Sequence, residues 1–295
     1  MTPGTTPGMG TGLWIVAAGI VGLVAGSFIN VVILRLPRML ETRWCRTTAK
    51  IRDKRSPDNA NAELSLTWPP SACPHCDARL KPWHNVPVIS FVALRGRCHQ
   101  CRHTISLQYP LVELMAAVFG IVAILHFGAT PAALGATVLG WLLLPAAIID
   151  ARTGLLPDHL TLTTLWLGLL ASLGYSVGLS SIAPAAAIAG ASVGYGALWT
   201  LDRAFYLVTG QRGMGHGDFK LTAALGAWLG ATSLPWVLFL AACFGLAISA
   251  TLALAGRPDR ARQIPLGPWL ALGGWINLLY GPWFIDAYSH AIGLH

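Results

Sequence analysis

The sequence predicts an all-α protein that crosses a membrane several times. Of its 295 residues, 54% are hydrophobic and only 11% are charged, and its mean hydropathy is +0.58. Residues 13–34 contain no Asp, Glu, Lys or Arg, and a run of this length can cross a bilayer as a helix. Such a composition is typical of polytopic membrane proteins rather than of soluble domains.

Further apolar stretches follow residue 111, and together with the first they predict eight membrane-spanning helices. Only the short turn 232–235 separates the sixth stretch from the seventh. The expected spans are residues 13–34, 111–127, 131–149, 160–179, 182–202, 221–234, 236–255 and 268–286. We expect three parts along the chain, namely the N-terminus with the first helix (1–34), a polar domain (35–110) and a membrane domain (111–295).

The distribution of basic residues predicts the orientation of these spans. Residues 1–12 contain no Lys or Arg, whereas Arg35 and Arg38 follow the first apolar run. This run should therefore be retained in the protein, with its N-terminus outside the cytoplasm. All 20 Lys and Arg then fall in segments predicted to be cytoplasmic, as the positive-inside rule requires. The net charge of +8 thus indicates membrane topology and contact with anionic lipid, not nucleic-acid binding.

Several polar residues border the first two spans. Asn30 lies within the first apolar run, and its amide is expected to hydrogen-bond a neighbouring helix. The segment 35–38, which contains Pro37, should end this helix. Glu113 stands near the start of the second span, where an acidic side chain interacts favourably with the helix dipole. Contact with a positively charged substrate is the alternative for Glu113.

The polar domain carries the cysteine spacing of a metal site. Cys73 and Cys76 form one C-x-x-C pair, and Cys98 and Cys101 form a second pair after 21 intervening residues. This is close to the spacing of four-cysteine zinc sites. Two disulfides are the alternative, but the domain is predicted to be cytoplasmic, where thiols stay reduced. Four thiolates leave no ligand position for water, so the predicted zinc ion is structural.

Two acids occur where apolar runs meet polar breaks. Asp150 ends the run 139–149, and Asp218 follows the loop 209–217, which contains four glycines. An ionisable side chain at the edge of a membrane segment costs a few kcal/mol and is therefore a candidate functional residue. If the two carboxyls meet, one should keep its proton while the other ionises. Such a pair can activate water and protonate a leaving amine.

Asp158 competes with Asp150 for this role. Asp158 follows Pro157 beside the start of the next helix, where an acid is expected to act as a cap. Asp150 lies at the end of a helix, where the dipole disfavours negative charge, so function is the better explanation. We therefore assign the pair to Asp150 and Asp218. The secondary candidates are Asp158, Gly215, Gly217 and Lys220. A separate expectation is an ion pair between Asp202 and Arg203 at the end of the fifth span.

Together, these motifs resemble those of bacterial type IV prepilin leader peptidases, in the branch with a zinc-binding cytoplasmic domain. The resemblance covers nearly the whole chain. In the N-terminal part of the chain, the resemblance rests on the segments 26–37 and 109–114 and on the two C-x-x-C pairs. The segments 149–158 and 213–220 are similar to the two aspartate motifs of the family, the second being its G-x-G-D signature. Many relatives carry acids where this chain has Arg152 and Arg212.

The resemblance implies a bifunctional enzyme of the bacterial inner membrane. Such enzymes cut the basic leader from type IV prepilins and type II secretion pseudopilins at the cytoplasmic face. They then methylate the new N-terminal amine, typically of phenylalanine, with S-adenosylmethionine. The resemblance assigns catalysis to Asp150 and Asp218 and zinc binding to the four cysteines. The alternatives are an ion transporter that uses the two acids as pathway carboxylates and a zinc-anchored scaffold for secretion machinery.

Overall fold

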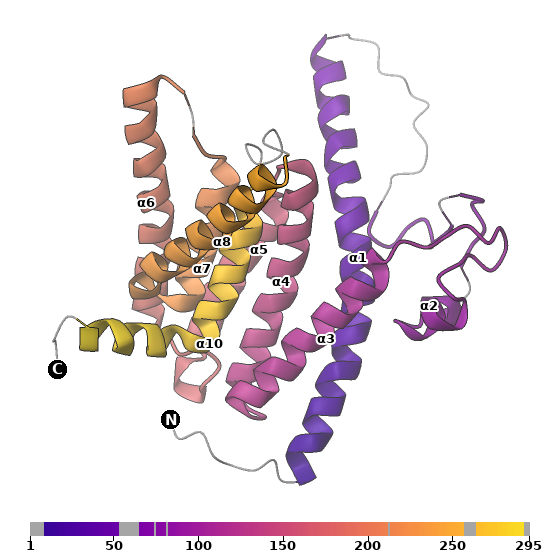
Figure 1. The fold of residues 1–295 in the computed structure, drawn as a ribbon, viewed down its shortest axis with the longest axis horizontal. Coiled ribbons are helices and arrows are strands. Elements are labelled where there is room, and N and C mark those ends of the chain that lie inside the picture. Colours follow the sequence, from indigo (N-terminus) through magenta and orange to yellow (C-terminus); the bar gives the residue numbers. More distant parts are fainter. Residues whose placement is uncertain are drawn as a thin grey trace. The chain divides into compact units, whose positions relative to one another are not determined.

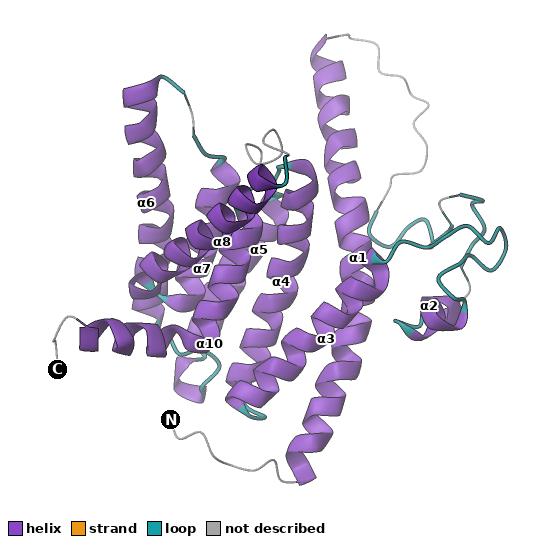
Figure 2. Ribbon diagram, viewed as in Figure 1, coloured by secondary structure: helices purple, strands orange, loops and turns teal. Residues whose placement is uncertain are grey.

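The computed structural model describes residues 9–52, 65–73, 75–80, 82–211, 213–256 and 264–291, and these are helical apart from loops and turns (Figures 1 and 2). The long helices are α1 (Met9–Arg52), α3 (Gln108–Phe127), α4 (Pro131–Thr153), α5 (Asp158–Leu173), α6 (Pro184–Thr209), α7 (His216–Leu229), α8 (Leu234–Leu254) and α10 (Gly267–Ala291). The short ones are η1 (Pro82–Asn85), α2 (Ile89–Ala93), η2 (Tyr175–Val177) and η3 (Ala231–Ser233). Each of the eight expected spans overlaps one long helix, so the prediction of a helical chain is confirmed.

Four helical segments within the described residues are long and apolar enough to cross a membrane. They are Thr11–Cys45, Gln108–Phe127, Pro131–Thr153 and Ala231–Leu254. By contrast, α5 and α7 have 16 and 14 residues, fewer than the roughly 20 that a membrane-spanning helix needs. The chain is therefore a helical membrane protein, and a total of eight crossings stays a prediction.

The chain forms two compact parts, residues 1–121 and 122–295, which are considered separately. In the first part, glycines allow α1 and the start of α3 to pack closely. A Cβ added at Gly26 would lie only 2.5 Å from the Cα of Glu113, so a larger residue there would separate the helices. Asn30 donates from Nδ2 to the backbone oxygen of Tyr109 at 3.0 Å. The expected interhelical role of Asn30 is confirmed.

Two expectations about the first part are wrong. The first helix does not end at 35–38, because α1 continues through Pro37 to Arg52. A proline removes only one backbone hydrogen bond, and the Arg, Met and Leu residues around it are good helix formers. Glu113 is the sixth residue of α3, beyond its first turn. Its Oε2 accepts the N–H of Val88 at 2.8 Å, so it ties the segment before α2 to α3.

In the second part, α7 forms the centre of the packing. It contacts α5, α6, α8 and α10, and every residue from Leu221 to Leu229 is buried. Gly190 of α6 and Gly226 of α7 face each other so closely that neither has room for a Cβ. On the α5 side, Trp228 donates from Nε1 to the backbone oxygen of Thr164 at 2.9 Å. The helix that carries Asp218 in its first turn is thus held firmly on several sides.

Candidate active site and candidate metal centre

Asp150 lies in the last turn of α4, and its side chain is buried. Only 4% of the residue is exposed. The helix ends at Gly154, which adopts a left-handed conformation with φ 65°. The Gly154 N–H donates to the backbone oxygen of Asp150 at 2.8 Å, a usual way to end a helix. The sequence therefore ends α4 within one turn after the acid.

The carboxylate of Asp150 is held by a residue that the sequence analysis missed. Gly267, the first residue of α10, donates its backbone N–H to Oδ2 of Asp150 at 3.0 Å. A Cβ at Gly267 would lie 3.0 Å from the Cγ of Asp150 and closer still to Oδ2. A side chain at this position would therefore displace the carboxylate. The signal in the sequence was a Gly-Pro pair at the start of the last apolar stretch, but it does not reveal a partner 117 residues away.

Asp218 lies in the first turn of α7, before the apolar stretch 221–234 and outside the four candidate spans. Burial raises the pKa of its carboxyl to about 6, and the negative charge of Asp150 acts in the same direction. A backbone hydrogen bond from Gly215 partly opposes this shift. The carboxyl of Asp218 therefore lies within range of the charge of Asp150. Asp218 therefore loses its proton far less readily than an ordinary aspartate.

The two glycines of the predicted motif serve different purposes. Gly215 is the N-cap residue of α7 in an extended conformation, and its carbonyl accepts the backbone N–H of Asp218 at 3.1 Å. Gly217 lies against the break between α4 and α5, where an added Cβ would be 2.7 Å from the Cβ of Leu156. The lack of a side chain at Gly217 thus allows the segments that carry the two acids to approach each other.

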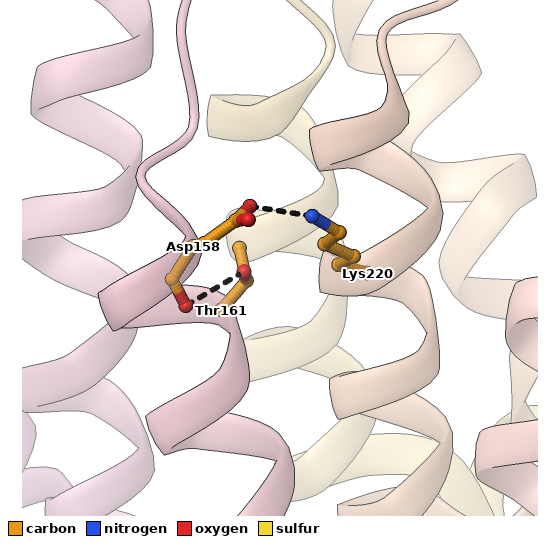
Figure 3. Close-up of polar contacts among 3 residues, drawn as sticks. All are labelled: Asp158, Thr161 and Lys220. Carbon is orange, nitrogen blue, oxygen red and sulfur yellow. Dashed lines mark hydrogen bonds and ion pairs between the residues drawn. The ribbon is translucent and has the colours of Figure 1, made fainter. Parts of the chain in front are cut away.

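Asp158 and Lys220 form an ion pair between α5 and α7 (Figure 3). The Nζ of Lys220 lies 2.6 Å from Oδ1 of Asp158, and the two side chains are 27% and 61% exposed, respectively. The expectation that Asp158 caps α5 is wrong, because Pro157 is the N-cap residue and Asp158 is already helical. An acid in the first turn still interacts favourably with the helix dipole. This pair links the two acid-bearing segments at an exposed position.

Asp202 does not form the expected ion pair with Arg203. Its Oδ1 accepts the backbone N–H groups of Gly213 and Met214, at 3.0 and 3.1 Å. The guanidinium of Arg203 instead lies over the ring of Tyr206, 5.8 Å from the ring centroid. Asp202 was expected in an ion pair at the end of a membrane span, but its carboxylate binds the glycine-rich loop. Arg152 lies in the exposed last turn of α4, and Arg212 lies outside the described residues.

The two C-x-x-C pairs lie in short hairpins with the same backbone geometry. Isolated bridges pair Ala72 with Arg79 and Arg97 with Thr104. The N–H of Cys73 donates to the carbonyl of Ala78 at 3.0 Å, and the N–H of Cys98 donates to that of His103 at 2.8 Å. In both hairpins the first cysteine is thus bonded to the residue five positions later. The repeated spacing in the sequence therefore corresponds to a repeated fold.

The four cysteines of these hairpins come together in one cluster. Cys73, Cys76, Cys98 and Cys101 have sulfur atoms that all lie within 4.8 Å of one another, and none of them forms a disulfide. The sulfur atoms of Cys73 and Cys101 are 3.8 Å apart. A tetrahedral zinc ion with Zn–S bonds of about 2.3 Å requires about this sulfur separation. The cluster therefore fits a four-coordinate metal ion.

Comparison with known families matches most of the chain. Residues 20–127 match the family described as Bacterial Peptidase A24 N-terminal domain. Residues 137–250 match the Type IV leader peptidase family. The first match contains the cysteine cluster, and the second contains Asp150 and Asp218. Gly267 lies beyond both matches.

Curated relatives cover nearly the whole chain. A prepilin leader peptidase/N-methyltransferase of Pseudomonas putida is 42% identical over 282 residues, which are 95% of this chain and 96% of the relative. Proteins of the same name from Burkholderia pseudomallei (strain K96243) and Aeromonas hydrophila are each 44% identical. They cover 92% and 88% of this chain, and 87% and 88% of their own lengths, respectively. No solved structure matches the chain significantly.

Proposed function

The chain belongs to the type IV leader peptidase family, and we propose that it is an intramembrane aspartic endopeptidase that removes the basic leader of type IV prepilins and type II secretion pseudopilins. It then methylates the new N-terminal amine, typically of phenylalanine. The observation that carries the proposal is the pair of neighbouring carboxyls of Asp150 and Asp218. The printed name of the relatives, prepilin leader peptidase/N-methyltransferase, supports both activities.

The two acids take different protonation states in the proposed mechanism. Asp150, whose Oδ2 accepts the Gly267 N–H, is the ionised base, because an N–H donor suits a charged carboxylate oxygen. Asp218, with a pKa raised to about 6, is the acid. Like charges at close range cannot both ionise without cost, so the pair should hold one proton in its stable state.

Each step of the hydrolysis then transfers protons between the substrate and the two acids. Asp150 takes a proton from water as the water oxygen bonds to the scissile carbonyl carbon, and Asp218 gives its proton to the carbonyl oxygen. When the C–N bond breaks, Asp150 returns its proton to the leaving amine and Asp218 recovers one from the diol. The products are a leader with a free carboxyl group and a pilin with a free amine. Both acids end in their starting states.

The methyl transfer uses S-adenosylmethionine, which supplies an electrophilic methyl group. Two cavities among the described residues do not fit this group. One, of about 600 Å³, is lined only by small or apolar residues and Thr200 of α6. The other holds about 210 Å³, less than the roughly 300 Å³ at the low end of small-molecule sites. We therefore assign no residue to the methyl donor and derive no step through it.

The proposal places the protein in the bacterial inner membrane with eight spans and a periplasmic N-terminus. We keep the expected division of the chain into residues 1–34, 35–110 and 111–295. Helix α1 crosses the boundary between residues 34 and 35. All 20 Lys and Arg then lie on the cytoplasmic side, which supports this orientation. Asp150 and Asp218 lie at the same face, where a membrane-embedded prepilin would present its basic leader.

The four-cysteine cluster holds a structural zinc ion in this proposal. Four sulfur atoms within 4.8 Å of one another support zinc, since soft thiolates favour this metal and fill all four of its ligand positions. The ion stabilises the fold of the polar domain and has no place for a substrate water. Its role is thus separate from that of the two aspartates.

The test of the proposed function is incubation of the full-length protein in detergent micelles with a leader-bearing prepilin. Intact mass measurement should show loss of the leader without S-adenosylmethionine, and the additional mass of one methyl group when it is supplied. A prepilin that stays intact under both conditions would contradict the peptidase assignment. A cleaved but never methylated product would contradict only the second activity.

A further inference from the structure

Asp202 lies on α6, near the end of that helix at Thr209. Only 7% of the residue is exposed, whereas residues 203–210 after it are all exposed. Its Oδ1 accepts the N–H groups of Gly213 and Met214, at 3.0 and 3.1 Å. A single buried carboxylate oxygen therefore binds two successive backbone groups of the loop that leads into α7.

This loop is rich in glycine, so its backbone depends on contacts with neighbouring segments for a fixed path. Residues 210–217 include four glycines, and glycine gives the backbone more conformational freedom than any other residue. A cavity of about 210 Å³ lies where α6 faces the start of α7. Its lining residues are Trp199, Asp202, Arg203, His216 and Phe219. The two hydrogen bonds to Asp202 therefore attach the loop to α6 beside this cavity.

The loop leads directly into the first turn of α7, which carries Asp218. Gly215 directly follows Met214, is the N-cap residue of α7 and accepts the backbone N–H of Asp218 at 3.1 Å. Gly213 also fits closely against α6, because an added Cβ would lie 3.1 Å from the ring of Phe205. A change of backbone path at Gly213 and Met214 would thus move the first turn of α7 together with its acid.

We propose that Asp202 is a positioning residue, which fixes the backbone of Gly213 and Met214 and thereby sets the place of Asp218 relative to Asp150. The inference rests on the proposed function of Asp218. Asp202 itself contacts no reacting atom in this account. Its Oδ1 accepts two N–H groups, while the guanidinium of Arg203 lies over Tyr206.

The test compares Asp202→Ala, Asp202→Asn and the control Arg203→Ala in full-length protein with a prepilin substrate. The alanine variant lacks the acceptor, so we expect kcat to fall about 10- to 100-fold, the range for a small misplacement of a catalytic group. KM for the prepilin should change less than about twofold, because Asp202 does not bind substrate. The asparagine variant keeps an acceptor oxygen and should retain at least about a third of wild-type kcat.

A second readout follows the loop directly and does not depend on activity. Hydrogen exchange measured by mass spectrometry on a peptide covering residues 209–218 should be faster in Asp202→Ala than in the wild type and in Asp202→Asn. Exchange in a peptide from α10 serves as the internal control and should be unchanged. Equal exchange of the loop in the alanine variant and the wild type would overturn the inference.

The kinetic outcomes separate this inference from the proposed function. Wild-type kcat in Asp202→Ala, together with loss of cleavage in Asp218→Asn, would overturn the role of Asp202 alone. Wild-type cleavage in Asp218→Asn would overturn the proposed function and the inference with it. If Asp202→Ala does not fold, Asp202→Asn still tests the inference. A kcat of Asp202→Asn below about a tenth of the wild-type value would overturn it, because an acceptor oxygen at this position would then not be sufficient to position the loop.

Discussion

The cysteine hairpins and the aspartate segments are both pairs of motifs that are distant in the sequence, but their local structures differ. In the hairpins, Asp77 and Arg102 occupy equivalent positions with φ values of 53° and 57°, and each donates its N–H to the carbonyl of the first cysteine, at 2.9 and 3.0 Å respectively. Asp150 ends a helix, whereas Asp218 begins one. Two matching hairpins suit two pairs of metal ligands, and unequal surroundings suit two acids with opposite proton-transfer roles.

Loss of a metal ligand should produce the largest effect. Cys73→Ser and Cys98→Ser come from different hairpins, and each should reduce bound zinc from one equivalent to below about half, because binding of structural zinc contributes about 10–16 kcal/mol. Metal analysis of protein purified without chelators measures this. Cys243→Ser is the matched control, since Cys243 lies outside the cluster. Zinc retained in only one of the two ligand variants would contradict the equivalence of the hairpins.

Substitution of Gly267 should have the next largest effect, because it acts on only one acid. Gly267→Ala places a Cβ against the carboxylate of Asp150, whose side chain can rotate away without unfolding the protein. We expect kcat for prepilin cleavage to fall about 100-fold. Gly196→Ala is the control, because a Cβ at Gly196 has no neighbour within 4 Å. Equal rates in the two variants would show that Gly267 does not position Asp150.

The pH dependence should reveal that the two acids differ. Burial and the charge of Asp150 raise the pKa of Asp218 to about 6, and the proposed acid works only in its protonated form. As pH rises above this pKa, the protonated fraction falls, so kcat should fall by up to about tenfold per unit. Single-turnover cleavage between pH 5 and 8.5 measures this. A rate that stays constant from pH 6 to 8 would contradict a proton-donating Asp218.

Loss of the exposed ion pair should have the smallest effect. Asp158→Asn removes the charge partner of Lys220, but the Asp158 side chain is 61% exposed, and exposed pairs contribute about 0–1 kcal/mol. We expect kcat/KM to change less than about threefold. Enzyme assays and thermal unfolding measure the two effects. A loss comparable to that of Gly267→Ala would instead place Asp158 in the reaction.

Much of the helical content could be predicted from the sequence, because apolar runs of about 20 residues have few other stable structures. The helix ends were predicted less well. Residues 35–52 are polar but favour helix locally, so α1 extends to Arg52. The end of α6 was placed at Asp202, yet the helix continues to Thr209. A buried carboxylate can occur within a helix when backbone groups from elsewhere bind it.

The residues of the candidate site also differ in how well the sequence predicts them. The cysteine cluster depends on local spacing within two short hairpins, and the sequence contains that information directly. The choice of Asp150 and Asp218 rested on the helix dipole and on glycines, and their shared catalytic role stays a proposal. Gly267 and Asp202 could not be predicted, because their roles arise from contacts across 117 residues and from an unexpected continuation of α6.

The central claim is that Asp150 and Asp218 together hydrolyse the leader peptide bond. The most direct measurement is the intact mass of a prepilin after incubation with the wild type, Asp150→Asn or Asp218→Asn, each shown to be folded and to contain its metal. The account predicts complete loss of the leader with the wild type and an uncut prepilin with either variant. Cleavage by either variant at the wild-type rate would contradict it.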